Sequence, residues 1–223
     1  MNATMPARGA RHEVRRIRER ASYMRADLHA VLDAGWIAHV GFNGDDGQPF
    51  VMPMLYCRDG DDGLLLHGSI ASRLLLHLAG GVPACVTVTH IDGLVLARSH
   101  FHHSVNYRSA VCFGIARPID AAEAKAEALA RFVDAILPGR AAESRAADRN
   151  ELAATRLLRL HIEDASVKVR RGGPRDDPAD RGLPHWAGVV PMALRYDTPE
   201  KGEDAPVDVP LPDSVRRLYR DAS

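Results

Sequence analysis

Three short apolar runs separated by Asp-Gly-rich turns constrain the fold of this chain more than any other feature. The runs are residues 36–43, 48–57 and 63–69, and the segments between them contain GDDG and RDGDDG. The runs follow the two-residue period of a half-buried strand. Glycine supplies the positive φ of a tight turn, so Asp-Gly between apolar runs is a strong hairpin signal. The sequence therefore predicts three antiparallel strands in a meander.

More strand-like segments follow along the chain. Residues 84–100 predict a hairpin that turns at Asp92-Gly93, residues 107–119 a further long strand, and residues 157–172 one or two closing strands. Six or more antiparallel strands with few helices predict a small closed barrel with peripheral helices. Pro53 lies within the second apolar run, so that strand must be an edge, a bulge or a ligand-facing segment.

Four helices are predicted around this barrel. One begins near residue 23, one spans Ser72 to Leu78, and one covers roughly residues 143–155. A further helix follows Asp120, which forms a capping box with Glu123. These helices are short or amphipathic, so they cover the barrel rather than form a core of their own.

Length and composition predict one domain with extensions. The chain has 223 residues, of which 46% are hydrophobic and 26% charged, as in ordinary globular proteins. We expect residues 1–20 to form a flexible N-terminal segment, residues 21–196 the barrel domain with a C-terminal extension, and residues 197–223 a Pro- and Asp-rich tail.

Charge and hydropathy exclude some partners. The formal net charge is zero, so no overall field favours nucleic acid or an anionic membrane. The N-terminus lacks the apolar region of a signal peptide, and no run approaches the length of a membrane span. We therefore expect a cytoplasmic protein without a membrane span.

The stretch from Leu64 to Gly81 places polar residues inside a leucine-rich segment. Ser72 is a natural N-cap, and a helix N-terminus offers N–H donors to an anion. Arg73 adds a bidentate donor suited to phosphate, Ser69 adds a hydroxyl, and Gly68 allows close approach of the backbone. This pattern predicts an anion site, and the alternative is a capped helix with one surface arginine.

Several common catalytic motifs are missing. No lysine follows a glycine-rich loop as in a Walker A motif, and the glycines of residues 41–47 lie between strands rather than before a helix. The chain also has no G-x-S-x-G motif, which argues against a serine hydrolase.

Four histidines, His90, His100, His102 and His103, form a second polar cluster. On an extended strand His100 and His102 would share a face, which is the spacing of a two-histidine metal site. No carboxylate motif lies nearby, so we predict no metal site and interpret these residues as pocket-lining or solvated histidines. Haem ligation is the alternative.

Five motifs in a fixed order resemble a known family. They are Pro53-Met54-Leu55-Tyr56, His67-Gly68-Ser69, Ser72-Arg73, Asn106-Tyr107-Arg108-Ser109 and Phe113-Gly114. The set resembles the pyridoxamine 5'-phosphate oxidase-like family of FMN-binding split barrels, and more narrowly its flavin-nucleotide-binding branch with the nitroimidazole-reductase-like proteins. The resemblance covers about residues 20–170.

This resemblance implies a mainly β fold: a six-stranded antiparallel split barrel of Greek-key type with peripheral helices. It also implies a homodimer with FMN at the subunit interface. The strand of Pro53, Met54, Leu55 and Tyr56 would then lie along the isoalloxazine ring and offer it backbone groups. The chain lacks the basic residues that hold substrate in true pyridoxamine phosphate oxidases, so we expect a different substrate.

The remaining site residues follow from the same resemblance. Ser69, Ser72 and Arg73 would hold the phosphate of the cofactor, and His67 and Gly68 would also contact the cofactor. From the other subunit, three residues would approach the ribityl chain or the ring: Asn106, Tyr107 and Ser109.

The implied activity is that of an oxidoreductase acting on a small planar substrate, with His67 and Tyr107 as candidate catalytic groups. Two alternatives stay open. One is a non-enzymatic flavin-binding or storage protein, and the other is a haem-binding or haem-degrading relative on the same fold.

Overall fold

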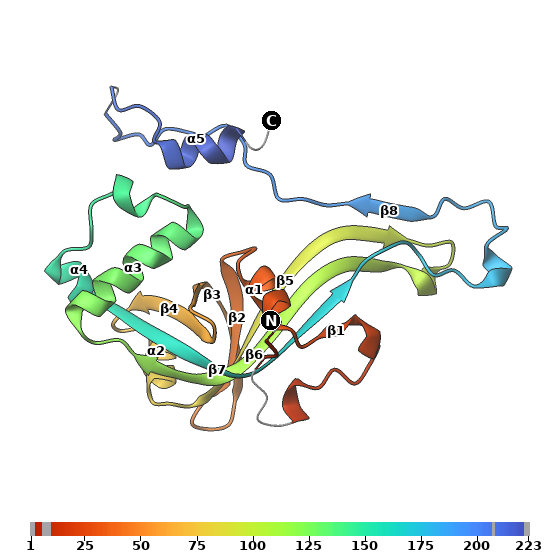
Figure 1. The fold of residues 1–223 in the computed structure, drawn as a ribbon, viewed down its shortest axis with the longest axis horizontal. Helices are drawn as coiled ribbons and strands as arrows, with labels where there is room; N and C mark the ends of the chain where they lie inside the picture. Colours follow the sequence, from red (N-terminus) through yellow and green to blue (C-terminus); the bar gives the residue numbers. More distant parts are fainter. Residues whose placement is uncertain (1–2, 6–9, 207, 221–223) are drawn as a thin grey trace.

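The structure, a computed structural model, describes residues 3–5, 10–206 and 208–220. Its strands and α-helices, drawn in Figure 1, are β1 (Ala21–Ser22), α1 (Arg25–Leu32), β2 (Ile37–Asn43), β3 (Pro49–Asp59), β4 (Gly63–Ser69), α2 (Arg73–Ala79), β5 (Pro83–Leu96), β6 (Ser104–Pro118), α3 (Ala122–Ile136), α4 (Arg149–Ala154), β7 (Thr155–Arg170), β8 (Gly188–Pro191) and α5 (Asp213–Arg220). Short 3₁₀ helices include η1 (Ala10–His12), η2 (Arg18–Arg20) and η3 (His100–His102).

The six long strands close into an antiparallel barrel, as the sequence predicts. Their order is β7-β4-β3-β2-β5-β6, and β6 pairs with β7 to complete the circle. The two short strands lie outside this circle, β1 on β7 and β8 on β5. The fold class is therefore confirmed, with eight strands in the described part of the chain rather than six.

The predicted hairpin over residues 84–100 is wrong. β5 runs without a turn from Pro83 to Leu96, and a register shift between Ile91 and Gly93 marks a β-bulge. A Cβ on Gly93 would lie 2.9 Å from the Val190 carbonyl oxygen, so glycine allows β8 to pair closely here. The Asp-Gly pair therefore serves a bulge and a close strand contact instead of a turn.

The predicted capping box at Asp120 is also wrong. α3 begins after Ala121 without a side-chain cap. A capping box does form one helix later, where the Asp148 side chain accepts from the backbone of α4 and the Glu151 side chain accepts from the Asp148 N–H. α4 is consequently shorter than the predicted 143–155.

Two apolar clusters hold the barrel together. The main cluster fills the barrel interior with side chains such as Leu64, Leu66 and Leu160, all fully buried. A smaller cluster lies outside the barrel, where Phe132 of α3 packs against Leu65 and Leu157. The helix thus covers one side of the barrel and leaves other outer surfaces of the sheet exposed.

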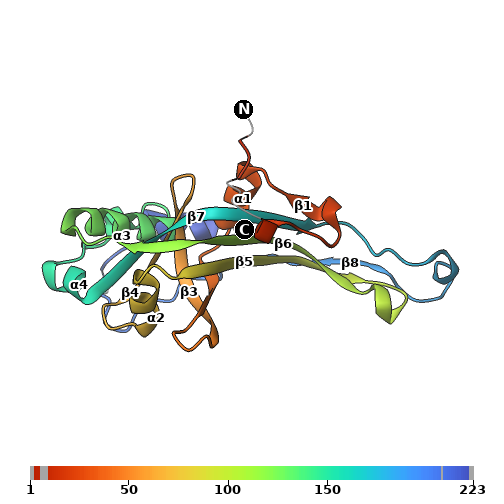
Figure 2. The same cartoon turned by 90° about the horizontal axis from the view of Figure 1, so that it is seen from below.

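The molecule is elongated because part of the sheet continues beyond the barrel. Figures 1 and 2 show β5 and β6, joined by β8, projecting away from α3 as an arm. The chain then returns toward α3, where the Ser214 backbone N–H donates to a Glu143 carboxylate oxygen at 3.1 Å. At the other end of the sequence, Arg11 forms ion pairs with Glu163 and Asp164 of β7.

Within the described ranges, no helix combines the length and apolar character needed to cross a membrane.

Candidate functional site

The outer surface of the sheet brings several predicted site residues onto one face. Pro53 pairs with His39, and His39 pairs with Thr87. Farther along β5, Thr89 pairs with Ser109 and Ile91 with Tyr107. Directly paired residues of antiparallel strands point to the same side of the sheet, so these side chains share the outer face.

This outer face is unusually apolar for an exposed surface. Ile37 of β2 is 50% exposed, and on β3 Val51 is 64% and Leu55 39% exposed. Contiguous apolar surface of this kind marks a contact site for a ligand or another protein. Pro53 and Leu55 therefore lie on a surface that a ligand or another protein can cover.

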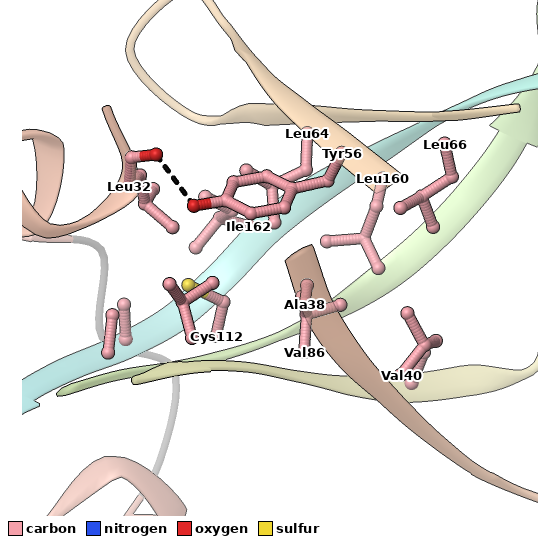
Figure 3. Close-up of a cluster of buried hydrophobic side chains, with 14 of the residues drawn as sticks. Leu32, Ala38, Val40, Tyr56, Leu64, Leu66, Val86, Cys112, Leu160 and Ile162 are labelled. Carbon is pink, nitrogen blue, oxygen red and sulfur yellow. Dashed lines mark hydrogen bonds between the residues drawn. The ribbon is translucent and has the colours of Figure 1, made fainter. Parts of the chain in front are cut away.

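Met54 and Tyr56 alternate with these residues and point the other way. The Tyr56 side chain is fully buried in the barrel, and its hydroxyl donates a hydrogen bond to the Leu32 carbonyl oxygen at 2.6 Å (Figure 3). Burial raises the pKa of the Tyr56 hydroxyl. The Tyr56 side chain therefore belongs to the core, and a ligand on the outer face would meet only its backbone, whose N–H already donates to Trp36.

The segment around α2 forms a polar corner beside a cleft. The Ser72 hydroxyl accepts from the Leu75 N–H at 3.4 Å, which confirms the predicted N-cap. The Ser69 hydroxyl accepts from the Ala71 N–H at 3.2 Å. Both hydroxyls thus stabilise the turn into α2, while exposed Arg73 forms no ion pair or hydrogen bond with any residue that the structure describes.

Arg73 and Ser72 line a cleft of about 900 Å³ between α2 and the β2–β3 turn. Its opposite wall is aromatic, because Phe42 stacks on Phe50 with ring centroids 5.4 Å apart. His77 lies against Phe42 and contacts the Asn43 carbonyl oxygen at 2.7 Å. A flat apolar wall facing a free guanidinium suits a planar ligand, and Arg73 can donate to an anionic group of that ligand, while Asp45 and Asp46 line another part of the cleft.

Sequence reasoning missed the aromatic side of this cleft. Phe42 and Phe50 flank a turn that was interpreted only as a hairpin connection, and they meet because β2 and β3 place them directly opposite each other. The sequence did contain a signal for His77, because it follows Arg73 by four residues and residues four apart share one face of a helix.

Gly68 acts through packing. A Cβ there would lie 3.0 Å from the Leu75 side chain, so the glycine lets α2 fold closely against the end of β4.

His67 lies beneath α3. Its ring stacks on Phe132 with centroids 4.3 Å apart, and its buried Nδ1 has no hydrogen-bond partner in the described part of the chain. Burial lowers the pKa of His67, which keeps the imidazole neutral.

His67 and Tyr107 are far apart within one protomer. Leu157, the strand partner of His67, accepts from the Ile119 N–H at the end of β6, twelve positions after Tyr107. At about 3.3 Å per residue, this separation is roughly 40 Å along the strand. A site that contains both residues would therefore need two protomers.

Asn106 and Ser109 lie inside β6, which begins at Ser104, three residues before the predicted strand start at residue 107. The Asn106 side-chain oxygen accepts from Arg170 Nη1 at 2.5 Å, and Asn106 is nearly buried. The Ser109 hydroxyl donates to the Lys168 carbonyl oxygen at 3.4 Å. The half-buried Tyr107 hydroxyl forms no hydrogen bond with a described residue.

The four clustered histidines do not converge. His90 Nε2 contacts the Val31 carbonyl oxygen at 2.9 Å, while His102 lies 3.3 Å from Asp177. His100 and His102 belong to η3 and not to an extended strand, so their predicted spacing is wrong. No group of three or more metal-binding side chains occurs among the residues with described positions.

Comparison with known proteins identifies the family to which this barrel belongs. A sequence profile described as pyridoxamine 5'-phosphate oxidase matches residues 24–169. The chain belongs to this family, which confirms the resemblance.

Two solved structures resemble nearly the whole chain. The flavocytochrome Anf3 from Azotobacter vinelandii is 38% identical, with a TM-score of 0.88 over 96% of this chain and 98% of that one. An FAD and haem binding protein from Mycobacterium smegmatis is 42% identical, with a TM-score of 0.85 over 89% and 97%.

A candidate 5-nitroimidazole antibiotic resistance protein from Bacteroides thetaiotaomicron is 19% identical, with a TM-score of 0.57 over 67% and 86%, and shows the shared fold alone. No curated protein matches the chain.

Proposed function

We propose that this protein is a homodimeric redox protein that binds a flavin nucleotide and a haem. The observation that carries the proposal is the likeness, at 38% and 42% identity over most of the chain, to a flavocytochrome and to an FAD and haem binding protein. The residues on the outer face and in the α2 cleft offer suitable contacts for both groups.

The α2 cleft and the open edge of β3 fit a flavin nucleotide. Phe50 and Met52 line the cleft, whereas Pro53 and Leu55 lie on the opposite face of the strand. Among the described strands, residues 49–55 of β3 pair with β2 alone, so a ligand can extend past this edge from one face to the other. Arg73 has no described partner and can donate two hydrogen bonds to a phosphate. The exposed side chains of Pro53 and Leu55 provide a flat apolar surface for the ring system. The sequence predicts FMN, whereas the name of the mycobacterial relative favours FAD.

His39 fits the role of a haem ligand. Its imidazole is exposed on the outer face and forms no hydrogen bond, ion pair or ring contact with a described residue, and its strand neighbours include Pro53. Exposed Ile37 and Leu55 flank it with apolar surface. Histidine is the common axial ligand of haem iron, and an apolar surround suits the porphyrin.

The exposed surface supports a dimer. A compact monomer of 24.3 kDa is expected to expose about 10,000 Å². The chain exposes 14,019 Å², about 4,000 Å² more than the expected area. Obligate homodimers bury surfaces of this order. A second copy over the outer face would also turn an open surface into an enclosed cofactor site.

A bound flavin supplies hydride and single-electron transfer, and the protein supplies binding, orientation and access. In this chain, Arg73 would hold the phosphate end, and the outer face would exclude water from the ring. Tyr107 would reach the same site from the partner subunit. We propose a small planar molecule as the electron acceptor, as the resemblance implies, with a flavin-storage protein as the alternative.

Absorption spectra of the purified protein test the proposal. We expect flavin bands together with a Soret band, and extraction followed by chromatography identifies FMN or FAD. His39→Ala should remove the haem and retain the flavin. His185→Ala, at an exposed histidine outside the barrel strands, serves as the matched control. A protein purified without either absorption, and unable to take up flavin or haem, would contradict the proposed function.

Turnover separates the enzyme from the binder. An oxidoreductase should consume NAD(P)H in the presence of a small acceptor, whereas a storage protein should only retain the flavin.

A further inference from the structure

Arg170 at the end of β7 is a buried cation without a carboxylate partner among the described residues. Only 5% of its surface is exposed. Its guanidinium donates to the Asn106 side-chain oxygen at 2.5 Å and to the carbonyl oxygens of Gly172 and Gly173 at 3.2 Å. The buried Nε has no hydrogen-bond partner in the described ranges. All of its acceptors are therefore uncharged.

Two further arginines increase the positive charge at this place. Arg20 of η2 directly precedes β1, whose Ala21 pairs with Lys168, two residues before Arg170, and Arg175 follows Arg170 by five residues. Burial lowers the pKa of Arg170, and repulsion from Arg20 and Arg175 lowers it further. Neither Arg20 nor Arg175 forms an ion pair with a residue that the structure describes. The phenol of Tyr107 also lies within electrostatic range of Arg170.

The nearby carboxylates are already engaged with other arginines. Asp176 accepts from both the backbone N–H and the guanidinium of Arg98, at 2.9 and 2.6 Å. Asp92 forms a forked pair with Arg108 at 2.9–3.2 Å. Arg98 and Arg108 thus have counterions, whereas Arg20, Arg170 and Arg175 form no ion pair with a described residue.

A buried guanidinium beside two like charges is unfavourable unless an anion compensates it. We propose that Arg20, Arg170 and Arg175 form a binding site for a phosphate group. Three cations require more than one negative charge, and phosphate carries nearly two at neutral pH, whereas a carboxylate carries one. The planar fork of arginine also matches the geometry of phosphate oxygens.

This site is separate from the α2 cleft and does not depend on the proposed flavin and haem function. The phosphate has two possible sources, a free phosphate-bearing molecule or a phosphate of a flavin nucleotide that reaches the cluster. The chemistry at the arginines is the same in both cases.

Calorimetric titration of the full-length protein with inorganic phosphate and with pyrophosphate tests the site. The titrations use the wild-type protein, Arg20→Met, Arg175→Met and Arg58→Met at matched ionic strength. Arg20 and Arg175 lie on segments outside the barrel, so their replacement leaves the core intact. Arg58 pairs with Asp33 elsewhere and serves as the control. We expect the first two variants to bind at least about tenfold more weakly and Arg58→Met to bind like the wild type.

Titration with FMN and FAD identifies the source of the phosphate. Weaker flavin binding by Arg175→Met and Arg20→Met would assign the site to the cofactor. Unchanged flavin binding with lost binding of inorganic phosphate would assign it to a separate phosphate ligand. The proposal is wrong if neither variant differs from Arg58→Met in binding phosphate, pyrophosphate, FMN or FAD.

Discussion

Replacement of Tyr56 by phenylalanine separates a core role from a cofactor role at this position. The Tyr56 hydroxyl is fully buried and donates to the Leu32 carbonyl oxygen at 2.6 Å, so the hydroxyl joins β3 to the C-terminal end of α1. The phenylalanine ring keeps the packing, so the change removes one hydrogen bond without opening a large cavity.

The expected cost follows from this geometry. Water cannot replace the lost donor at a fully buried position, and an unsatisfied buried carbonyl costs about 1–3 kcal/mol. A chain of this size loses about 2–4 °C in melting temperature per kcal/mol, so Tyr56→Phe should melt several degrees lower. Flavin affinity should stay unchanged, because the hydroxyl lies inside the barrel and the proposed flavin surface lies outside it.

Calorimetric melting of cofactor-stripped protein at pH 7, combined with flavin titration, measures both effects. Tyr107→Phe is the matched control, because that hydroxyl has no described hydrogen-bond partner and lies on the outer face. We expect the opposite pattern from it, with nearly unchanged melting and altered flavin affinity or reduction rate. Wild-type melting together with weakened flavin binding in Tyr56→Phe would refute the core role.

Three further predictions follow from the site. Arg73→Ala should weaken flavin binding about tenfold or more without lowering the melting temperature, because it removes a charge-assisted contact to phosphate; equal affinities in titration would remove Arg73 from the site. Burial lowers the pKa of His67 in the folded protein, so the unfolded chain binds a proton at His67 at a higher pH than the folded protein does. Folding stability should therefore decrease as the pH falls below about 6.5, the pKa of an unperturbed histidine. Between pH 7.5 and pH 5.5, the melting temperature of His67→Phe should decrease less than that of the wild type, and equal decreases in the two proteins would contradict this reasoning. Leu55→Asp should convert the dimer to monomers in light scattering, since it places a charge on the apolar outer face, and a dimer that survives this change would place the interface elsewhere.

Local sequence determined much of the fold and part of the site. Asp-Gly turns between apolar runs define the β2–β3–β4 meander, because a tight turn and an alternating pattern each depend on neighbouring residues alone. The N-cap at Ser72 is local in the same way, since the hydroxyl and the N–H that it accepts from are three residues apart. These features could be predicted because few alternative partners compete for them.

Tertiary structure decided the features that depend on distant partners. Asp92-Gly93 has the same residues as a hairpin turn, but the approach of β8 and the pairing of Asp92 with Arg108 make it a bulge in a continuous strand. The motif from Pro53 to Tyr56 identifies a strand, while only barrel closure determines that Tyr56 points inward.

The pairing of charges around Arg170 could not be predicted from local sequence either. The sequence contains many arginines, and nothing in their spacing indicates which of them find carboxylates. Arg20 and Arg170 are 150 positions apart in the sequence, and they become neighbours because β1 pairs with the end of β7. Ion pairing depends on distance in space, so only the folded chain decides which arginines are left without a counterion.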